Sequence, residues 1–493
     1  MKSNRNMSRG EGRRLGNVAL IAFMLGSLLL LSLIRARFSP IGKTEEAMKA
    51  EEQQVMTKES GKMQTAYGAG ASSAAEDEEE ETTPTQVGGV VSSTSVAAGN
   101  KKQQAVCFET SRRSDTCEAG GDVRVQGRAQ TIHVGGPLDR EWKIKPYCRK
   151  TDAFALAHVK EWTLRPISAA AASAPPRCTV NSSATAFVLS TGGFTGNLFH
   201  DYTDVLIPAF ITARRFAGDV QFLVSSHKSW WTSRYAQIFQ QLSRHEVVDA
   251  DADDEVRCYP NVVVGPRFHK ELGVDPAQTP GGPYSMPDFR AMLRAAFGLE
   301  RPTAAPTGDT WDIRRRPRLL IISRRATRRF MNERGMADMA GSLGFDVRVA
   351  DPEATSDVSK FARLVNSADV MVGVHGAGMA NMVFLPAGAV VIQVVPYGGL
   401  EWLARGTFGE PCGDMELHYL EYRIQLDETT LSEQYGKDDP VLKDPAAVHK
   451  QGWNALKTVY LDKQNVKPHL GRLKNTFLEA LKLLPHGRQQ RNN

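Results

Sequence analysis

Four residues between two apolar runs have the composition of an anion-binding loop. They are His375, Gly376, Ala377 and Gly378. The flanking runs, 370–374 and 390–395, have the pattern of buried strands, so the loop stands at the carboxyl end of the first strand. Glycine permits a ligand to approach the backbone closely, and a loop that opens a helix points its N–H groups at anions. A tight turn without any ligand is the alternative that the same residues allow.

Arginines gather at the end of another apolar run. Nine of them lie between residues 314 and 334. Arg324 and Arg325 follow directly on the run 318–323. The planar guanidinium group matches the oxygens of a diphosphate, and its charge would offset that of a diphosphate leaving group. We assign Arg324 and Arg325 to this role, and a solvated basic face is the alternative for the cluster as a whole.

A histidine and a carboxylate are spaced to face one cleft in the first half of the chain. His200 and Asp204 follow an apolar run and a glycine loop within STGGFTGNLFHDYTD (190–204). Residues four apart project from the same face of a helix. Such a pair can supply a general base, with Asp204 either fixing the tautomer of the imidazole or itself accepting the proton. Capping of the helix N-terminus by acidic residues is the alternative.

A metal site has weaker support. Asp251 and Asp253 lie in the acidic run DADDEVR (249–255) with an Asp-x-Asp spacing, but no glycine loop follows, which favours a solvated turn. The sequence has no CxxC pair and no HExxH, GxSxG, P-loop or EF-hand spacing. Zinc sites, metalloproteases, common hydrolases, kinases and calcium sensors therefore lack support.

Alternating strands and helices must position these residues. The expected strands cover 186–190, 219–226, 318–323, 345–350, 370–374 and 390–395. The expected helices cover 200–215, 230–242, 333–343, 357–367 and 470–484. A stretch rich in Pro and Arg at 300–317 separates the two series. We therefore expect an α/β protein with two doubly wound halves.

The first hundred residues contain an apolar span and a polar stem. Residues 18–34 carry no charge and are long enough to cross the hydrocarbon core of a bilayer. The flanking basic residues weakly favour a cytosolic N-terminus and a lumenal remainder. A cleaved signal peptide is the alternative, but no A-x-A-like site precedes Arg35. Residues 35–105 are too polar to bury a core, which predicts a flexible stem.

Six cysteines follow the apolar span and predict disulfides in an oxidising compartment. They are Cys107, Cys117, Cys148, Cys178, Cys258 and Cys412. Fifteen complete pairings of six cysteines are possible, and we favour the short loop between Cys107 and Cys117. Asn181 begins a glycosylation sequon. The net charge of +6 comes from local clusters without interleaved aromatic residues, so nucleic acid is not expected as a partner.

Several longer stretches together resemble a known family. They are HGAG (375–378), NMVFLPAGAVVIQVVPYGG (381–399), FGEP (408–411), LEYRI (420–424), NLFHDYTD (197–204) and IISRR (321–325). These stretches resemble plant glycosyltransferase family 61, in particular the large grass group of xylan-decorating enzymes, over residues 106–480. The resemblance implies transfer of a xylose or an arabinofuranose from a UDP-sugar, with inversion, onto xylan or arabinoxylan during cell-wall synthesis. It also implies a type II anchor in the Golgi membrane and a lumenal catalytic head.

The resemblance further implies a GT-B fold, with two Rossmann-like doubly wound domains that face a cleft, and no metal or other cofactor. The chain would divide into a cytosolic tail (1–17), a transmembrane anchor (18–34), a stem (35–105), an acceptor-side domain (106–312), a nucleotide-sugar domain (313–416) and a C-terminal segment (417–493). The pair at 200 and 204 would serve the acceptor, and the arginines and the loop 375–378 would face the phosphates.

Two other functions fit parts of the sequence. A lumenal glycan-binding or scaffold protein could keep the fold without catalysis. A dinucleotide-dependent oxidoreductase would use the loop at Gly376 as a GxGxxG motif, but Asn381 stands where the third glycine belongs. The sequence does not specify the pentose, the linkage or partners in Golgi complexes.

Overall fold

The structure describes most of the chain after the stem. In the computed structural model the described residues are 106–135, 138, 140–167, 174–305, 316–352 and 357–485. All of them belong to one compact unit. The expected anchor and stem lie outside these ranges. Within the described ranges, no helix is both long enough and apolar enough to span a membrane.

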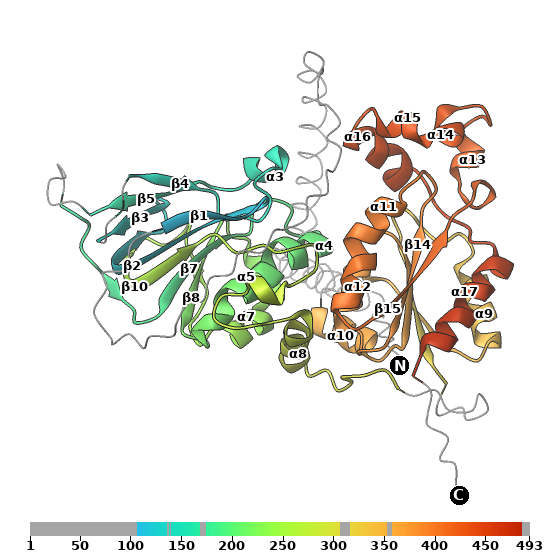
Figure 1. Ribbon diagram of the computed structural model, residues 1–493, viewed down its shortest axis with the longest axis horizontal. Coiled ribbons are helices and arrows are strands. Elements are labelled where there is room, and N and C mark those ends of the chain that lie inside the picture. The colour runs from blue at the N-terminus through green and yellow to red at the C-terminus, as the bar shows by residue number, and fades with distance from the viewer. Residues whose placement is uncertain are drawn as a thin grey trace, which may run out of the picture. The chain divides into compact units, whose positions relative to one another are not determined.

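The first of two sheets has ten strands of mixed direction (Figure 1). Its strands are β1 (Val106–Ser111), β2 (Ser114–Gln126), β3 (Thr131–Val134), β4 (Trp142–Ile144), β5 (Trp162–Pro166), β6 (Val180–Asn181), β7 (Thr185–Ser190), β8 (Val220–Ser225), β9 (Val248–Asp249) and β10 (Val256–Val264). The order is β4-β5-β3-β2-β10-β7-β8-β9, with β1 on β2 and β6 on β10. Strands β7 to β10 pair in parallel, whereas β2 is antiparallel to β1, β3 and β10.

Helices cover one face of this sheet. They are α3 (Ala153–Ala157), α4 (Leu198–His200), α5 (Ile207–Ala213), α6 (Ser229–Arg234), α7 (Ala236–Leu242) and α8 (Met286–Phe297). Phe187 of β7 and Phe222 of β8 pack in the same core as these helices. The hydrophobic cluster on the other face includes Val123 and Trp162, and its residues come from strands and loops rather than from helices. The first half is therefore a mixed sheet with helices on one face and not the expected doubly wound domain. Strands β1 to β5, which make the difference, were not predicted from the sequence.

The expected helix 200–215 is confirmed, with a π-helical turn, Asp201–Leu206, between α4 and α5. The expected helix 230–242 is present as α6 and α7. Because strand β7 ends at Ser190, the glycine loop and α4 lie at its carboxyl end. This places His200 at the start of the helix that the sequence predicted.

The second sheet has five parallel strands. They are β11 (Arg318–Ile322), β12 (Asp346–Ala350), β13 (Val370–Val374), β14 (Val390–Val395) and β15 (His418–Arg423), in the order β12-β11-β13-β14-β15. The first four match the strands expected from the sequence. The chain leaves β11 toward one edge and β13 toward the other, so the carboxyl ends of β11 and β13 form a topological switch point. Open α/β sheets bind their ligands at this position.

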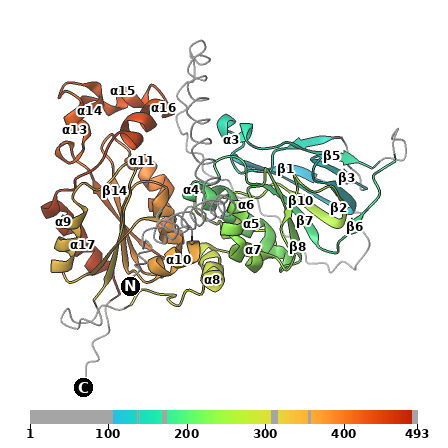
Figure 2. The ribbon, with the colours of Figure 1, turned by 180° about the vertical axis from the view of Figure 1, so that it is seen from behind.

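Helices lie on both faces of the second sheet. They are α9 (Glu333–Ser342), α10 (Val358–Asn366), α11 (Glu401–Ala404), α12 (Glu410–Asp414) and α17 (Leu470–Leu483). Four short helices pack instead in a separate cluster beyond the end of β14: α13 (Leu431–Gln434), α14 (Pro440–Lys443), α15 (Pro445–His449) and α16 (Trp453–Leu456) (Figure 1). Helices α9 and α17 lie side by side on one face (Figures 1 and 2), and α10 packs on the other. This half is doubly wound, as expected. Strand β15 and α17 complete it, so the boundary expected at 416 falls inside this unit.

One hydrophobic core continues from the first half into the second. It includes Phe289 of α8 and Phe384, which follows β13. Arg290 of α8 is also buried, and its guanidinium donates hydrogen bonds to the carbonyls of Val383, Leu385 and Met415. Because a buried guanidinium needs several acceptors, these bonds fix α8 against the second half.

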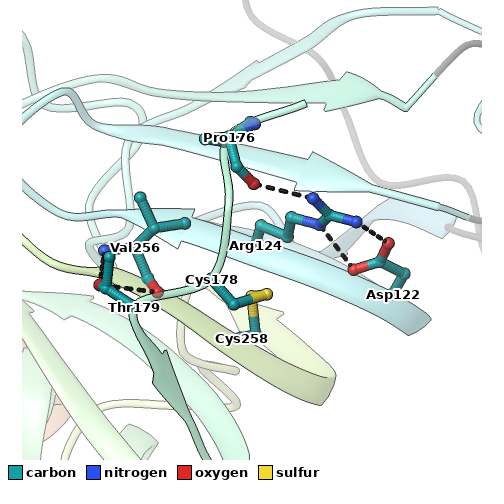
Figure 3. Close-up of a disulfide and its surroundings, with 7 residues drawn as sticks. All are labelled: Asp122, Arg124, Pro176, Cys178, Thr179, Val256 and Cys258. Carbon is teal, nitrogen blue, oxygen red and sulfur yellow. Dashed lines mark hydrogen bonds and ion pairs between the residues drawn. A yellow bond between two sulfur atoms is a disulfide. The ribbon is translucent and has the colours of Figure 1, made fainter. Parts of the chain in front are cut away.

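Two disulfides are present among the described cysteines. Cys107–Cys117 joins β1 to β2, as favoured from the sequence, and Cys178–Cys258 holds the chain before β6 against β10 (Figure 3). Near the second disulfide, Arg124 bridges Asp122 and the carbonyl of Pro176 (Figure 3). The predicted disulfides therefore include four of the six cysteines. Cys148 and Cys412 are buried and free.

Candidate active site

The loop after β13 combines buried polarity with an unusual backbone. His375 is 6% exposed, and its backbone N–H donates to the carbonyl of Val394 on the neighbouring strand. Gly376 has φ of 149° and ψ of 176°, a combination that only glycine adopts readily. The residues Ala377–Phe384 then form a 3₁₀ helix. The strand-to-helix turn expected from the sequence is therefore present, and one of its two glycines is conformationally required.

Two guanidinium groups lie against this glycine. A Cβ placed on Gly376 would be 3.0 Å from Nη1 of Arg324 and 3.0 Å from Nη1 of Arg328. Arg328 donates from Nη1 to the carbonyl of His375 at 2.9 Å, and Arg324 donates from Nε to the carbonyl of Thr327. The loop after β11 thus meets the loop after β13 at the switch point.

Arg328 is half-buried and is held against the loop after β13. Its Nε has no hydrogen-bond partner among the described residues. Burial, and then repulsion from Arg324, lower the pKa of Arg328 to about 10, so the side chain still carries its charge at neutral pH. Two adjacent positive charges, together with the unpartnered Nε–H of Arg328, suit an anion with several oxygens.

The other residues assigned to this loop have different surroundings. The side chain of Arg325 is 74% exposed and pairs with Asp351, its Nε lying 3.5 Å from Oδ2. A Cβ on Gly378 would contact Ile322 and Pro352 rather than an arginine. Ala377 is half-buried at the start of the 3₁₀ helix. The structure brings together Arg324, His375 and Gly376 but not these three.

The imidazole of His375 is electrostatically isolated from acids. Nε2 of Gln393 lies 2.8 Å from its Nδ1. Burial first, and then the charges of Arg328 and Arg324, lower the pKa of His375 to about 3. The imidazole is therefore neutral at neutral pH. A buried neutral histidine beside two guanidinium groups can donate a hydrogen bond without adding charge.

His200 and Asp204 form a close pair in the helix that follows the loop after β7. Nδ1 of His200 lies 2.9 Å from Oδ2 of Asp204. Asp204 also accepts from the hydroxyl of Tyr147 at 2.9 Å and from Nε of Arg149 at 2.7 Å. Its side chain has no exposed surface, whereas that of His200 is 19% exposed. The histidine can reach a ligand, and the carboxylate can only orient it.

A second carboxylate fixes the glycine loop ahead of this pair. Asp201 is 1% exposed and accepts hydrogen bonds from the backbone N–H of Gly196, the indole of Trp231 and the hydroxyl of Tyr235. Burial raises its pKa, and the donors oppose that shift. With all three donors in place, the loop, α4 and α6 are held together. These hydrogen bonds therefore hold the backbone of His200 in place.

Aromatic rings connect the two loops. The ring of Phe199 lies 5.3 Å from that of His200 and 5.5 Å from that of Phe408, between ring centroids. The ring of Phe408 in turn lies 5.6 Å from that of His375. Helix α4 also packs against the 3₁₀ helix that follows His375. His200 and His375 are 175 positions apart in the sequence. The two loops next to them nevertheless border one region of the structure.

The acidic run lies elsewhere and is occupied by ion pairs. Asp251 pairs with Lys160 at 3.0 Å, and Asp253 pairs with Arg257 at 2.7 Å. These residues form a turn, as expected, although Asp253 is paired rather than solvated. Across the described ranges, no group of three or more His, Cys, Asp or Glu side chains is arranged to hold a metal.

Sequence reasoning did not single out Arg328, Gln393 or the partners of Asp204. Arg328 was one of a crowded set, and its φ of 55° is invisible in sequence. Gln393 had a signal: it is a lone polar residue in the buried strand VVIQVV. Tyr147 and Arg149 gave no signal, because more than fifty residues separate them from Asp204.

This chain is similar to known glycosyltransferases over most of its length. A model of the family described as glycosyltransferase 61 matches residues 198–392. The chain is 43% identical over 380 residues to alpha-1,3-arabinosyltransferase XAT3 of Oryza sativa subsp. japonica, covering 76% of this chain and 65% of that protein. It is 40% identical over 397 residues to beta-1,2-xylosyltransferase XYXT1 of the same plant, covering 77% and 84%. It is 36% identical over 388 residues to xylan glycosyltransferase MUCI21 of Arabidopsis thaliana, covering 76% and 78%.

The matches cover different shares of the three relatives. The chain spans slightly less than two thirds, 65%, of the length of the arabinosyltransferase, but 84% and 78% of the other two proteins. The matched family region begins at α4 and ends in β14, so it contains His200 and His375. With such identity over most of two relatives, this chain belongs to glycosyltransferase family 61.

Proposed function

We propose that this protein transfers a pentose, xylose or arabinofuranose, from a UDP-sugar to xylan or arabinoxylan, with inversion. The observation that carries the proposal is that one region is bordered by a histidine–carboxylate pair and by two half-buried arginines. The printed names of the relatives, which are a xylosyltransferase, an arabinosyltransferase and a xylan glycosyltransferase, support the sugar class and the acceptor.

The arginine side would bind the donor. Arg324 and Arg328 flank Gly376 at the switch point of the second sheet, where a diphosphate can lie against the backbone. When the bond between the anomeric carbon and the diphosphate breaks, negative charge grows on the leaving oxygen. The guanidinium groups are already in place to stabilise that charge. No metal is required for this role in the proposal, because the arginines supply the positive charge.

The histidine side would activate the acceptor. His200 would take the proton from an acceptor hydroxyl through Nε2, while Asp204 holds the proton on Nδ1. The hydroxyl oxygen then attacks the anomeric carbon from the face opposite the diphosphate, which inverts the configuration. Asp204 is enclosed by Tyr147 and Arg149, so we assign it to orientation and no longer to proton abstraction.

The domain plan and location form part of the proposal. We infer a GT-B arrangement in which residues 106–312 serve the acceptor and 313–416 the nucleotide-sugar, with the segment from 417 completing the second domain. The two disulfides favour an oxidising compartment. Asn181 is exposed on β6, where an attached glycan would meet solvent. These features support a type II protein of the Golgi membrane whose head is lumenal and whose anchor is 18–34.

The direct test is transfer by the full-length protein. UDP-xylose and UDP-arabinofuranose are each incubated with xylo-oligosaccharides, and the mass and the anomeric linkage of the product are determined. We expect one pentose to be added with the anomeric configuration opposite to that of the donor. Retained configuration, or no product from either donor, would overturn the proposal.

Binding separates the two alternative functions. UDP should raise the melting temperature, because a ligand that binds the native state stabilises it, and NAD should not. Stabilisation by NAD alone would favour an oxidoreductase. Stabilisation by xylo-oligosaccharides without transfer would favour a glycan-binding protein.

A further inference from the structure

A buried polar chain runs from His375 into the second sheet. Gln393 is the lone polar residue of β14 and has no exposed surface. Its amide nitrogen lies 2.8 Å from Nδ1 of His375, and its carbonyl oxygen accepts from the hydroxyl of Tyr419 at 2.8 Å. The register places Gln393 between Gly373 on β13 and Glu421 on β15. The chain therefore crosses three adjacent strands.

The directions of these hydrogen bonds determine which ring nitrogen of His375 carries the proton. An amide nitrogen can only donate and an amide oxygen can only accept. In the structure the oxygen of Gln393 faces the hydroxyl of Tyr419, and its nitrogen faces Nδ1 of His375. Nδ1 must then be unprotonated in order to accept. A neutral imidazole carries one proton, which must lie on Nε2.

We propose that Gln393 is a positioning residue that keeps His375 as a neutral imidazole with its proton on Nε2. His375 then donates a hydrogen bond to an oxygen of the sugar diphosphate and acts neither as acid nor as base. This inference rests on the proposed function for the identity of the ligand. The tautomer itself is a property of the protein without ligand.

The charged groups around His375 agree with this role. From the loop after β11, Arg324 and Arg328 face it and oppose a second positive charge. At the far end of the chain, the hydroxyl of Tyr419 lies 3.5 Å from Glu421, which is itself paired with Arg405.

The other neighbours of the imidazole leave Nε2 available. The ring of Phe408 packs at its edge and provides no strong acceptor. Within the described ranges, no side chain or carbonyl accepts a hydrogen bond from Nε2 of His375. A donor that is oriented from behind and unused in front is suited to a ligand oxygen.

Nitrogen NMR of the full-length protein, with histidine labelled in the ring, tests the tautomer directly. The signals of His375 are identified by their loss in His375→Gln. At pH 7 we expect an unprotonated Nδ1 and a protonated Nε2, and we expect the Nε2 proton to shift downfield when UDP is added. A protonated Nδ1 in the parent, or saturating UDP that leaves Nε2 unchanged, would overturn the inference.

Gln393→Glu sharpens the test. A carboxylate can only accept, so Nδ1 of His375 should become protonated and its nitrogen signal should move to the protonated position. The matched control is Asn366→Asp, which makes the same amide-to-acid change at another buried site, where Asn366 bonds to Arg301 and Phe384. The control should lose stability without moving the signals of His375. An unchanged Nδ1 in folded Gln393→Glu would contradict the proposal.

The outcomes for the inference and for the proposed function are distinguishable. If the parent shows the Nε2–H tautomer and UDP moves it, but no pentose is transferred, the inference holds and the proposed reaction fails. If transfer occurs while His375 carries its proton on Nδ1, the proposed function holds and the role of Gln393 is wrong.

Discussion

The loops after β7 and β13 share a plan but differ in their charges. Each follows a buried strand, contains glycine and leads into a helix that begins near a histidine. His200 has a carboxylate 2.9 Å away, whereas His375 has an amide in the corresponding contact and guanidinium groups nearby. The same residue type therefore has opposite electrostatic surroundings.

This difference separates two chemical roles. A carboxylate behind an imidazole stabilises the positive charge that the ring acquires when it accepts a proton, as a general base requires. An amide behind an imidazole, with arginines beside it, disfavours that charge and leaves a neutral donor. One side is thus suited to move a proton and the other to hold an anion, a division that fits inverting transfer.

The largest expected effect tests the acceptor side. His200→Gln should lower kcat by about 10²–10⁴-fold, the usual contribution of a general base, while UDP binding is retained. The measurements are initial rates and calorimetric titration with UDP. His245→Gln is the matched control, since His245 also pairs with an aspartate, Asp219, at 3.0 Å but outside this loop. Equal rates for both variants would end the assignment of His200.

The second prediction tests the donor side. Arg328→Ala should weaken UDP binding by about 10–100-fold, because a hydrogen bond to a charged group contributes about 1.5–3 kcal/mol. Arg324→Ala should act in the same direction. Arg329→Ala is the control, because Arg329 is exposed and adjacent in sequence. If Arg329→Ala weakens UDP as much as Arg328→Ala, a general basic surface rather than a built site binds the diphosphate.

The third prediction separates the two glycines of the loop. Gly376→Ala should cost about 1–3 kcal/mol of stability through its backbone conformation, and its Cβ should also press on the arginines and weaken UDP binding. Gly378→Ala should leave UDP affinity nearly unchanged, since its Cβ would meet Ile322 at 3.3 Å. Urea unfolding and UDP titration measure both effects. Comparable loss of UDP affinity in the two variants would contradict the assignment of the contact to Gly376 and its arginines.

The fourth prediction uses the neutrality of His375. Its pKa is lowered to about 3 in the folded protein, whereas an unfolded histidine titrates near 6.5. Between these values the unfolded chain binds a proton that the folded protein does not, so stability falls as the pH drops below about 6.5.

At pH 5 this loss should amount to about 2 kcal/mol relative to pH 7. His375→Gln should remove that part of the pH dependence in urea unfolding. His418→Gln, at an exposed histidine on β15, should follow the parent. A parent and His375→Gln with the same slope between pH 7 and 5 would show that His375 is not the group responsible.

The smallest expected effect concerns metal. Because Arg324 and Arg328 are proposed to carry the charge of the diphosphate, EDTA should leave the rate of transfer essentially unchanged. The rate is measured before and after chelation and after manganese is restored. Loss of activity that manganese reverses would assign part of the leaving-group charge to a cation and weaken the contrast between the two loops.

The sequence by itself determined the features that depend on local spacing. Buried strands such as 370–374 and 390–395 could be predicted because their apolar runs are continuous. The contact between His200 and Asp204 followed from their four-residue spacing on a helix, and the Cys107–Cys117 disulfide from its short loop. Each of these depends on neighbours within about ten residues.

Tertiary structure alone decided the features that depend on distant segments. Arg328 and not Arg325 lies against Gly376, and its backbone φ of 55° cannot be predicted from its neighbours in the sequence. The proton of His375 is set by Gln393 from another strand. The mixed first sheet and the unpaired Cys148 likewise depend on which segments pack together. Local periodicity specifies which residues are buried, but only the packing of the chain specifies what they are buried against.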